Sequence, residues 1–309
     1  MEVSGFWMSL LATIGALLFS MYYILENLVL ALIPNKFLMK DITGDIVLCT
    51  GGGSGIGRLM CLKLAKKGAK IVTWDVNAEG NAETARQIKE AGGVCHAYTV
   101  DLCDRQAIYK CATTVKQEVG KVDILINNAG IVTGRNFKDS PDELIQRTFD
   151  VNIMSHFWTT KSFINEMMSS NKGHIVTVAS VAGYSGVNKL ADYCSSKFAA
   201  VGFDESLRLE MMVKYRRLLA LFVMPFYDFG KMYDDLKLSM LLPILEPEYV
   251  AQSSVDGILT NKVEVLLPGT LRILLILKVI LPEKALFILG RATGITCSMD
   301  EFKGRKKTQ

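Results

Sequence analysis

The sequence predicts an α/β protein, built as a doubly wound parallel sheet in a single domain, with an N-terminal membrane helix. Short apolar segments bounded by glycines alternate with longer segments of helical pattern, which is typical of parallel β-α-β units. A glycine cluster follows the first apolar segment and leads into a helix. An uncharged stretch of bilayer length stands at the N-terminus.

The composition fits one large domain with attachments and excludes several classes of protein. The chain has 309 residues, of which 50% are hydrophobic and 21% charged, so it is not a disordered chain. Its mean hydropathy of +0.26 is high for a soluble enzyme, which assigns some of the apolar excess to a membrane segment. The formal net charge is only +4, and no long basic run precedes the C-terminal tail, so nucleic acid is not an expected partner.

The cysteines and histidines form neither a disulfide framework nor a metal site. The cysteine count of 7 is odd and includes no C-x-x-C pair. The three histidines, His96, His156 and His174, have no ligand-like spacing, so we expect no metal. Reduced thiols indicate a domain that faces the cytosol.

Residues 1–35 are expected to form a membrane anchor. No charged residue occurs from Val3 to Leu25, and Phe6 to Leu25 is long enough to cross a bilayer. A cleaved signal peptide is the rival interpretation, but the chain starts with Glu2 instead of a basic residue, and no A-x-A site follows. Lysines after the segment place the remaining chain in the cytosol. Pro34 closes the apolar run, which leaves a longer helix or a hairpin in the membrane as alternatives.

Residues 41–267 carry the alternating pattern and are expected to form the nucleotide-binding domain, without a second domain or a repeat. Helices are expected at 58–67 and 78–91, and longer helical stretches at 141–170 and 191–213. Ligands of such folds bind beyond the carboxyl ends of the strands. The six expected strands are 45–50, 70–75, 94–100, 122–126, 173–179 and 217–223.

Residues 268–309 are expected to form a C-terminal apolar segment and a basic tail. An apolar region runs from Val263 to Leu289, and its core, Leu271 to Leu281, contains two basic residues. The core is short for a membrane crossing, so an interfacial helix, a lid over a pocket and a helix packed on the domain remain open. The chain ends in Lys306-Lys307-Thr308-Gln309, which resembles the dilysine retrieval signal of endoplasmic reticulum membrane proteins; a solvated basic tail is the alternative.

The first expected strand runs into a glycine-rich loop, Thr50-Gly51-Gly52-Gly53-Ser54-Gly55-Ile56-Gly57. Glycines let the backbone approach a pyrophosphate, and the following helix offers N–H groups with partial positive charge. Asp75 ends the second strand, where a carboxylate accepts hydrogen bonds from the adenosine ribose and repels a 2′-phosphate. No Arg or Lys stands there, so we expect a Rossmann-type site for NAD rather than NADP. The candidate residues of this loop are Gly51, Ser54, Gly55, Ile56 and Gly57.

Further motifs end the later strands and open the later helices. Asp101-Leu102 ends the third strand, and Asn127-Asn128-Ala129-Gly130 ends the fourth. Asn152 lies in the next helix, Ser180 ends the fifth strand, and Tyr193-Cys194-Ser195-Ser196-Lys197 opens the helix after it. With the T-G-x-x-x-G-x-G loop, these motifs resemble the short-chain dehydrogenase/reductase superfamily. Tyr-x-x-x-Lys occurs three times, but only Tyr193 has a serine thirteen residues earlier at a strand end.

The resemblance implies hydride transfer between an alcohol and NAD. Tyr193 would be the general base for oxidation and the acid for reduction. A tyrosine has an ordinary pKa of about 10, and Lys197, one helical turn on, supplies a cation that lowers it. Lys197 would also bind the nicotinamide ribose, Ser180 would hold the substrate oxygen, and Asn152 would hold a water in a proton relay. By the same resemblance, cofactor contacts are also assigned to Asp101, Leu102, Asn128, Ala129, Gly130 and Pro225.

Three segments, at 173–180, 193–200 and 241–247, resemble in sequence the membrane-anchored, retinol dehydrogenase-like 16C branch of the superfamily. That resemblance implies NAD-linked oxidation of all-trans-retinol to retinal, with a role in retinol and lipid metabolism. It places the enzyme in the endoplasmic reticulum membrane with its catalytic domain in the cytosol, or on a lipid droplet. A 17β-hydroxysteroid or another lipid alcohol is the alternative substrate. A homodimer through the helix that begins near Ala191 is also implied.

One segment departs from the family pattern. After the sixth strand the family has a proline and then a turn whose threonine holds the nicotinamide carboxamide. Here the segment Pro225 to Met232 contains no threonine and is a residue short. A misplaced ring would cut activity sharply. The third hypothesis is therefore a catalytically weak or inactive membrane or lipid-droplet relative.

Overall fold

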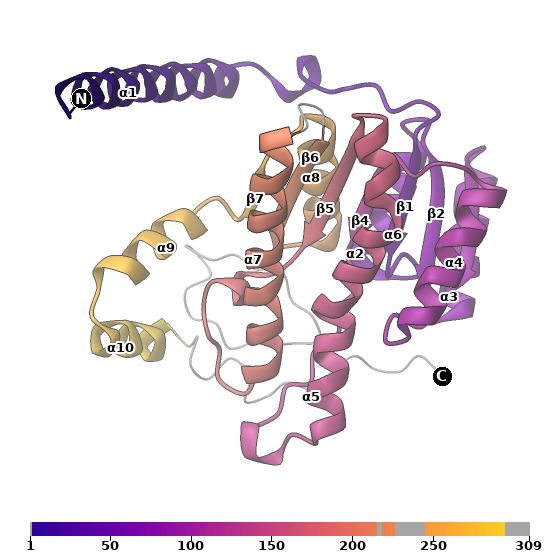
Figure 1. Ribbon diagram of the computed structural model, residues 1–309. Helices are drawn as coiled ribbons and strands as arrows, with labels where there is room; N and C mark the ends of the chain where they lie inside the picture. The colour runs from indigo at the N-terminus through magenta and orange to yellow at the C-terminus, as the bar shows by residue number, and fades with distance from the viewer. Residues whose placement is uncertain (1, 215–217, 226–244, 294–309) are drawn as a thin grey trace. The chain divides into compact units, whose positions relative to one another are not determined.

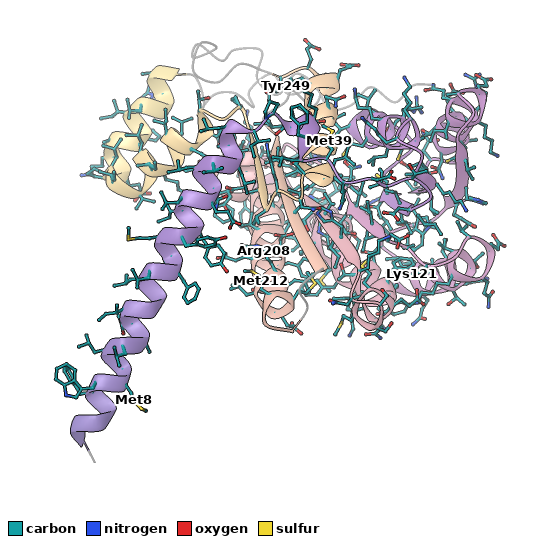
Figure 2. The ribbon with its side chains drawn as sticks, turned by 90° about the horizontal axis from the view of Figure 1, so that it is seen from above. Met8, Met39, Lys121, Arg208, Met212 and Tyr249 are labelled. Atoms are coloured by element: carbon teal, nitrogen blue, oxygen red, sulfur yellow. The ribbon has the colours of Figure 1, made fainter. Side chains whose placement is uncertain are left out.

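The computed structural model describes residues 2–214, 218–225 and 245–293. The chain divides into two compact units, Met1–Lys40 and Asp41–Gln309. The first unit contains α1 (Glu2–Leu32) and a short 3-10 helix (Asn35–Phe37). Within α1, the 27 residues Phe6–Leu32 have a mean hydropathy of 1.8 and are long enough to cross a membrane. The side chains of α1, Met8 among them, project around an unbroken helix, so the apolar run forms the longer helix and not a hairpin (Figures 1 and 2).

A seven-stranded parallel sheet forms the second unit, in the order β3-β2-β1-β4-β5-β6-β7 (Figure 1). The strand order reverses between β1 and β4, which is where ligands bind in doubly wound sheets. The predicted fold class is therefore confirmed. The strands are β1 (Ile46–Thr50), β2 (Lys70–Asp75), β3 (Val94–Thr99), β4 (Ile124–Asn127), β5 (Gly173–Val178), β6 (Leu218–Pro225) and β7 (Glu264–Leu267).

Helices connect the strands and pack in two groups. In one group α2 packs against α3 and α8, and in the other α4 packs against α6, while α5 packs against α7. The helices of this unit are α2 (Gly55–Ala65), α3 (Ala78–Glu90), α4 (Arg105–Glu118), α5 (Asp142–Phe149), α6 (Ser155–Ser169), α7 (Ala191–Lys214), α8 (Pro247–Leu259), α9 (Leu271–Ile280) and α10 (Glu283–Thr293).

The central strands are apolar because both faces of the sheet are covered. Every residue of β1, β4 and β5 is buried, which is the usual state of inner strands in a parallel sheet. On the side of α4 and α6, the rings of Trp74 and Phe163 pack at a centroid distance of 6.0 Å. This rigid sheet fixes the positions of the loops at its carboxyl edge.

Several elements differ from the sequence-based expectation, which gave no range for α4 or α8. β7 is a seventh strand that lies inside the apolar region expected to begin at Val263, where a four-residue run has too few residues to show a strand period. The helical stretch expected at 141–170 is divided by a π-helical turn, Asp150–Met154, between α5 and α6. Such turns insert an extra residue into a helix and are frequent at functional sites.

The C-terminal apolar segment forms α9 and α10. The inner face of α9 packs on the domain through Leu271, Leu274 and Leu275. Its outer face carries exposed aliphatic side chains, of which Val279 is 87% exposed. α9 is therefore a helix packed on the domain, with a second apolar face directed away from it.

Candidate active site

A cleft of about 330 Å³ opens at the carboxyl edge of the sheet, around the point where the strand order reverses. Its walls come from the loops after β1 to β5 and from the start of α7. The structure brings together every candidate from the sequence except Asn152 and Pro225. The candidates that line the cleft are Gly51, Ser54, Gly55, Ile56, Gly57, Asp75, Asp101, Leu102, Asn128, Ala129, Gly130, Ser180, Tyr193 and Lys197.

The glycine loop closes tightly on itself between β1 and α2. Gly51 has a φ of +66°, in the region that side chains disfavour, and a Cβ there would lie 2.9 Å from the Cα of Ala129. At Gly57 a Cβ would lie 2.2 Å from the carbonyl oxygen of Gly51. Both positions therefore require glycine, and the missing side chains leave the backbone open to a ligand.

The first turn of α2 has N–H groups to offer that ligand. Ser54 precedes the helix but makes no side-chain capping bond to it, and the first main-chain bond runs from Arg58 N to Ser54 O at 3.2 Å. The free N–H groups of a helix N-terminus carry partial positive charge and bind phosphate. The loop therefore fits the pyrophosphate of a dinucleotide.

Asp75 lies beside the glycine loop at the end of β2. Its Oδ2 accepts a hydrogen bond from the N–H of Gly53 at 2.9 Å, and its Oδ1 accepts one from the N–H of Asn77 at 2.9 Å. These two bonds fix the carboxylate at the wall of the cleft. Each oxygen keeps a second lone pair, so the carboxylate can also accept bonds from ribose hydroxyls.

Arg58 is the basic residue of the glycine loop region, and its guanidinium is engaged with protein oxygens. Its Nη2 donates to the carbonyl of Gly53 and to that of Gly80, and its Nε donates to the hydroxyl of Thr84 at 2.9 Å. The guanidinium therefore braces the loop against α3.

Thr50, the first residue of the glycine-loop motif and not a predicted site residue, ties β1 to β4. Its hydroxyl accepts bonds from the N–H groups of Asn128 at 3.0 Å and Ala129 at 3.1 Å. The amide of Asn128 in turn donates to Thr50 O at 2.9 Å. These bonds therefore hold the loop after β1 and the loop after β4 together at the cleft. No sequence signal identifies this pairing, because 78 residues separate Thr50 from Asn128.

Tyr193 and Lys197 lie one turn apart near the start of α7. The Lys197 side chain is buried, and its Nζ donates to Val178 O at 3.1 Å and lies 5.8 Å from the centre of the Tyr193 ring. Burial lowers the pKa of Lys197 to about 8, because the charged ammonium is poorly solvated there. The i, i+4 spacing that the sequence predicted thus directs both side chains into one cleft.

Ser180 follows β5 and begins a short 3-10 helix, Val181–Gly183. Its hydroxyl oxygen accepts a bond from the N–H of Ala182 at 3.2 Å, which orients the side chain at the cleft wall. The hydroxyl hydrogen is left for another acceptor, such as a substrate oxygen.

Asn152 lies behind the cleft wall and is fully buried in the π-helical turn. Its Oδ1 accepts from the N–H of Ile131 at 2.8 Å, while its Nδ2 donates to Ile131 O at 3.0 Å and to the Ser196 hydroxyl at 3.0 Å. The side chain therefore fastens the segment after β4 to α7. Ser196, which the sequence analysis named only inside the motif, is the partner that connects it to that helix.

The Tyr193 ring packs in an aliphatic cluster. Like Val132 from the segment after β4, Val187 from the loop before α7 and Leu274 from α9, it packs against a buried cluster. The buried members are Ala182, Leu190, Cys194 and Leu271. The tyrosine therefore packs on an apolar cluster, and part of that cluster comes from the C-terminal segment.

Pro225 is the last residue of β6 and pairs with Leu267 of β7. The remainder of the altered segment, 226–232, lies outside the described residues. No group of three or more metal-ligating side chains occurs in the part of the chain that the structure describes.

The sequence profile of the family described as short chain dehydrogenase matches residues 45–219, which is more than half of the chain. The chain belongs to the short-chain dehydrogenase/reductase family. It is therefore a short-chain alcohol dehydrogenase.

The relatives of this short-chain dehydrogenase cover nearly its whole length. It is 45% identical to epidermal retinol dehydrogenase 2 of Homo sapiens over 292 residues, 93% of this chain and 94% of that protein. It is 44% identical to short-chain dehydrogenase/reductase family 16C member 6 of Bos taurus over 292 residues, 93% of this chain and 92% of that protein. It is 43% identical to 17-beta-hydroxysteroid dehydrogenase 13 of Homo sapiens over 280 residues, 89% and 91% of the two chains. The enzyme therefore belongs to the retinol dehydrogenase-like 16C branch.

Solved structures share the fold and hold either form of the cofactor. A metagenomic short-chain oxidoreductase in complex with NADP is 26% identical, with a TM-score of 0.64 over 74% of this chain and 98% of that chain. A short-chain dehydrogenase from Burkholderia phymatum in complex with NAD is 23% identical, with a TM-score of 0.69 over 81% of this chain and 97% of that chain. The enzyme accordingly takes a nicotinamide cofactor.

Proposed function

We propose that this short-chain dehydrogenase is a membrane-bound enzyme that uses NAD to oxidise all-trans-retinol to retinal. The observation that carries the proposal is the Tyr193 and Lys197 pair, one helical turn apart in a cleft that the glycine loop also lines. The choice of substrate rests on the 45% identity to epidermal retinol dehydrogenase 2.

In the proposed reaction, Ser180 donates its hydroxyl hydrogen to the substrate oxygen, and Tyr193 accepts the alcohol proton as general base. The buried Lys197 ammonium favours the phenolate form of Tyr193 by its charge. A bound nicotinamide supplies the redox chemistry, because it accepts the hydride of the alcohol carbon. In the opposite direction Tyr193 returns the proton as general acid. Asn152 keeps the segment after β4 in place, and a relay water beside it is part of the proposal.

The proposed cofactor is NAD rather than NADP. The Asp75 carboxylate is fixed at the cleft wall, where it would accept ribose hydroxyls and repel a 2′-phosphate. Arg58, the basic residue of this loop region, is already engaged with oxygens of Gly53, Gly80 and Thr84. The other residues proposed to hold the cofactor are Gly51, Ser54, Gly55, Ile56, Gly57, Asp101, Leu102, Asn128, Ala129, Gly130, Lys197 and Pro225.

The apolar side of Tyr193 suits an apolar alcohol. Tyr193 packs against the same apolar cluster as Val132, Val187 and Leu274, so the substrate's hydrocarbon part would remain out of water there. A retinoid chain and a steroid ring system both meet this requirement.

The proposed location is the endoplasmic reticulum membrane, with residues 1–35 as anchor and the NAD-binding domain, 41–267, in the cytosol. The length and hydropathy of α1 support the anchor, and the exposed outer face of α9 within 268–309 offers a second apolar surface. A lipid droplet is the alternative location. A homodimer through α7 stays a prediction, supported by the exposed Met212 on that helix (Figure 2).

The test is NADH production by membranes that contain the full chain, supplied with all-trans-retinol and NAD. We expect activity that falls by about 10²-fold or more in Tyr193→Phe, because general base catalysis contributes that much. Equal activity in this variant would overturn the role of Tyr193. Absence of activity with retinol, from well-expressed protein, would overturn the substrate assignment.

A 17β-hydroxysteroid is the second candidate substrate. The 43% identity to 17-beta-hydroxysteroid dehydrogenase 13 favours it. The same assay with estradiol decides between the two, because the preferred substrate has the higher kcat/KM.

A further inference from the structure

Asp192 precedes the candidate base in α7 and is almost completely buried, although no motif assigns it a role. Only 8% of its surface is exposed. A buried carboxylate is costly unless hydrogen-bond donors surround it. Its donors therefore show what the residue is placed to hold.

Both oxygens of Asp192 have donors from different parts of the chain. Oδ1 accepts the N–H of Tyr193 at 2.8 Å, and Oδ2 accepts the hydroxyl of Thr133 at 2.6 Å. The hydroxyl of Thr148 in α5 lies 3.3 Å from the same Oδ2 and also donates to Leu144 O at 2.8 Å. The strongest tie from Asp192 to another element therefore runs to Thr133.

Thr133 belongs to the segment that follows β4 and lines the cleft. Gly130, Ile131 and Val132, immediately before it, are all part of the cleft wall. The Asp192–Thr133 bond thus connects the first turn of α7 to the strip of backbone beside which the cofactor is proposed to bind.

A second connection runs between the same two elements from the other side of Tyr193. The carbonyl of Tyr193 accepts the Ser196 hydroxyl at 2.7 Å, and Ser196 accepts the Asn152 amide at 3.0 Å. Asn152 then holds both main-chain groups of Ile131. The N–H and the C=O of Tyr193 are therefore both tied to residues 131–133, so that the bonds form a closed circuit around the candidate base.

We propose that Asp192, through Thr133, is a positioning residue that holds the Tyr193 turn of α7 against the cofactor-lining segment 130–133. This rests on the proposed function, because it assumes that Tyr193 is the base. A rigid-body shift of about 1 Å at a catalytic group can cost 10²-fold in rate, so the circuit is expected to affect kcat.

The decisive comparison is Thr133→Val with Thr133→Ser. Valine keeps the shape of the side chain but removes the hydroxyl, whereas serine keeps the hydroxyl. We expect Thr133→Val to lower kcat by about tenfold or more with the KM of the alcohol within about twofold, and Thr133→Ser to stay within about threefold of the parent enzyme. Thr113→Val is the matched control, because Thr113 is exposed in α4 and its hydroxyl, among the residues the structure describes, bonds only to Tyr109 O.

A double-mutant cycle separates the bond from independent packing effects. If the carboxylate acts through Thr133, Thr133→Val combined with Asp192→Ala will lower kcat no further than Asp192→Ala alone. Multiplicative losses in the double variant would overturn the proposal. So would a Thr133→Ser enzyme that falls as far as Thr133→Val.

Amide hydrogen exchange tests the circuit without activity. In Thr133→Val, peptides covering 130–135 and 191–197 are both expected to exchange faster, while Thr133→Ser and Thr113→Val leave them unchanged. Unchanged exchange of 191–197 in Thr133→Val would overturn the proposal. An enzyme that shows this exchange pattern but oxidises no alcohol would instead overturn the proposed function and leave the circuit standing.

Discussion

The ammonium nitrogen of Lys197 lies 5.8 Å from the ring centre of Tyr193, inside a site where burial lowers the lysine pKa to about 8. The same burial that strengthens the effect of the lysine charge on the phenol also makes that charge costly to keep. This relationship gives the site a pH dependence that can be measured both in activity and in stability.

Lys197→Met is expected to abolish activity and to stabilise the cofactor-free fold at pH 7. The folded pKa of about 8 lies below the ordinary 10.5, so the unfolded chain binds more protons between these values. The stability of the parent enzyme therefore rises with pH between these two values. Below pH 8 the buried lysine charge costs the fold its full penalty of about 3 kcal/mol. Urea unfolding from pH 7 to 10.5 checks this. If the stability gain of Lys197→Met over the parent enzyme does not shrink as the pH rises, the prediction is contradicted.

His156→Phe is expected to reduce the acid sensitivity of the fold. His156 is buried, neither ring nitrogen has a hydrogen-bond partner among the described residues, and burial together with the Lys197 charge lowers its pKa to about 3. The unfolded histidine titrates near 6.5, so the free energy of unfolding of the parent enzyme falls by about 2 kcal/mol from pH 7 to pH 5. The variant lacks the histidine and avoids this loss. Chemical unfolding at both pH values measures the difference, and equal losses would count against the prediction.

Asp75→Ala is expected to lower kcat/KM with NAD by about tenfold and to raise the relative use of NADP, because a ribose contact and a repulsive charge both disappear. Asp75→Asn is the matched variant, since its amide oxygen can still hold the Gly53 N–H while the charge is absent. If the relative use of NADP rises in both variants, the charge of Asp75 determines the preference for NAD. Unchanged selectivity in Asp75→Asn would assign it to the backbone bonds instead.

Gly57→Ala is expected to remove cofactor binding, because the new Cβ would lie 2.2 Å from Gly51 O, a backbone atom that cannot move freely. Gly202→Ala in α7 is the control, because alanine in a helix adds about 0.5 to 1 kcal/mol of stability. Apart from its own helix backbone and chain neighbours, no heavy atom of the described residues lies within 4 Å of its Cβ position. NADH fluorescence titration and thermal unfolding report the two effects. Normal NADH affinity in Gly57→Ala would refute the proposed pyrophosphate site.

Leu17→Arg combined with Leu18→Arg is expected to release the enzyme from membranes into carbonate at pH 11. Each charge costs about 2.5 to 3.5 kcal/mol at the centre of a membrane helix. Phe137→Arg, at a position that is 73% exposed outside α1, should remain bound. Carbonate release of the unaltered chain would argue against a spanning anchor.

Much of the fold and the cleft could be predicted because the signals are local. The glycine loop is read from consecutive residues, and Tyr193 and Lys197 share a helix face through their i, i+4 spacing. A parallel sheet then places the strand ends at one edge, so the residues that follow them meet in the cleft. The prediction did not extend to β7, whose four residues are too few to show a strand period.

The sequence by itself predicted most of the strands and helices in their order, the membrane-length helix and many of the residues that line the cleft. Only the tertiary structure decided which side chains hold them. Thr50 meets Asn128 across 78 residues, and Thr133 meets Asp192 across 59. The burial that lowers the Lys197 pKa likewise comes from elements packed around the start of α7. Such contacts depend on which strands become neighbours and how helices pack on them, and no local periodicity encodes that geometry.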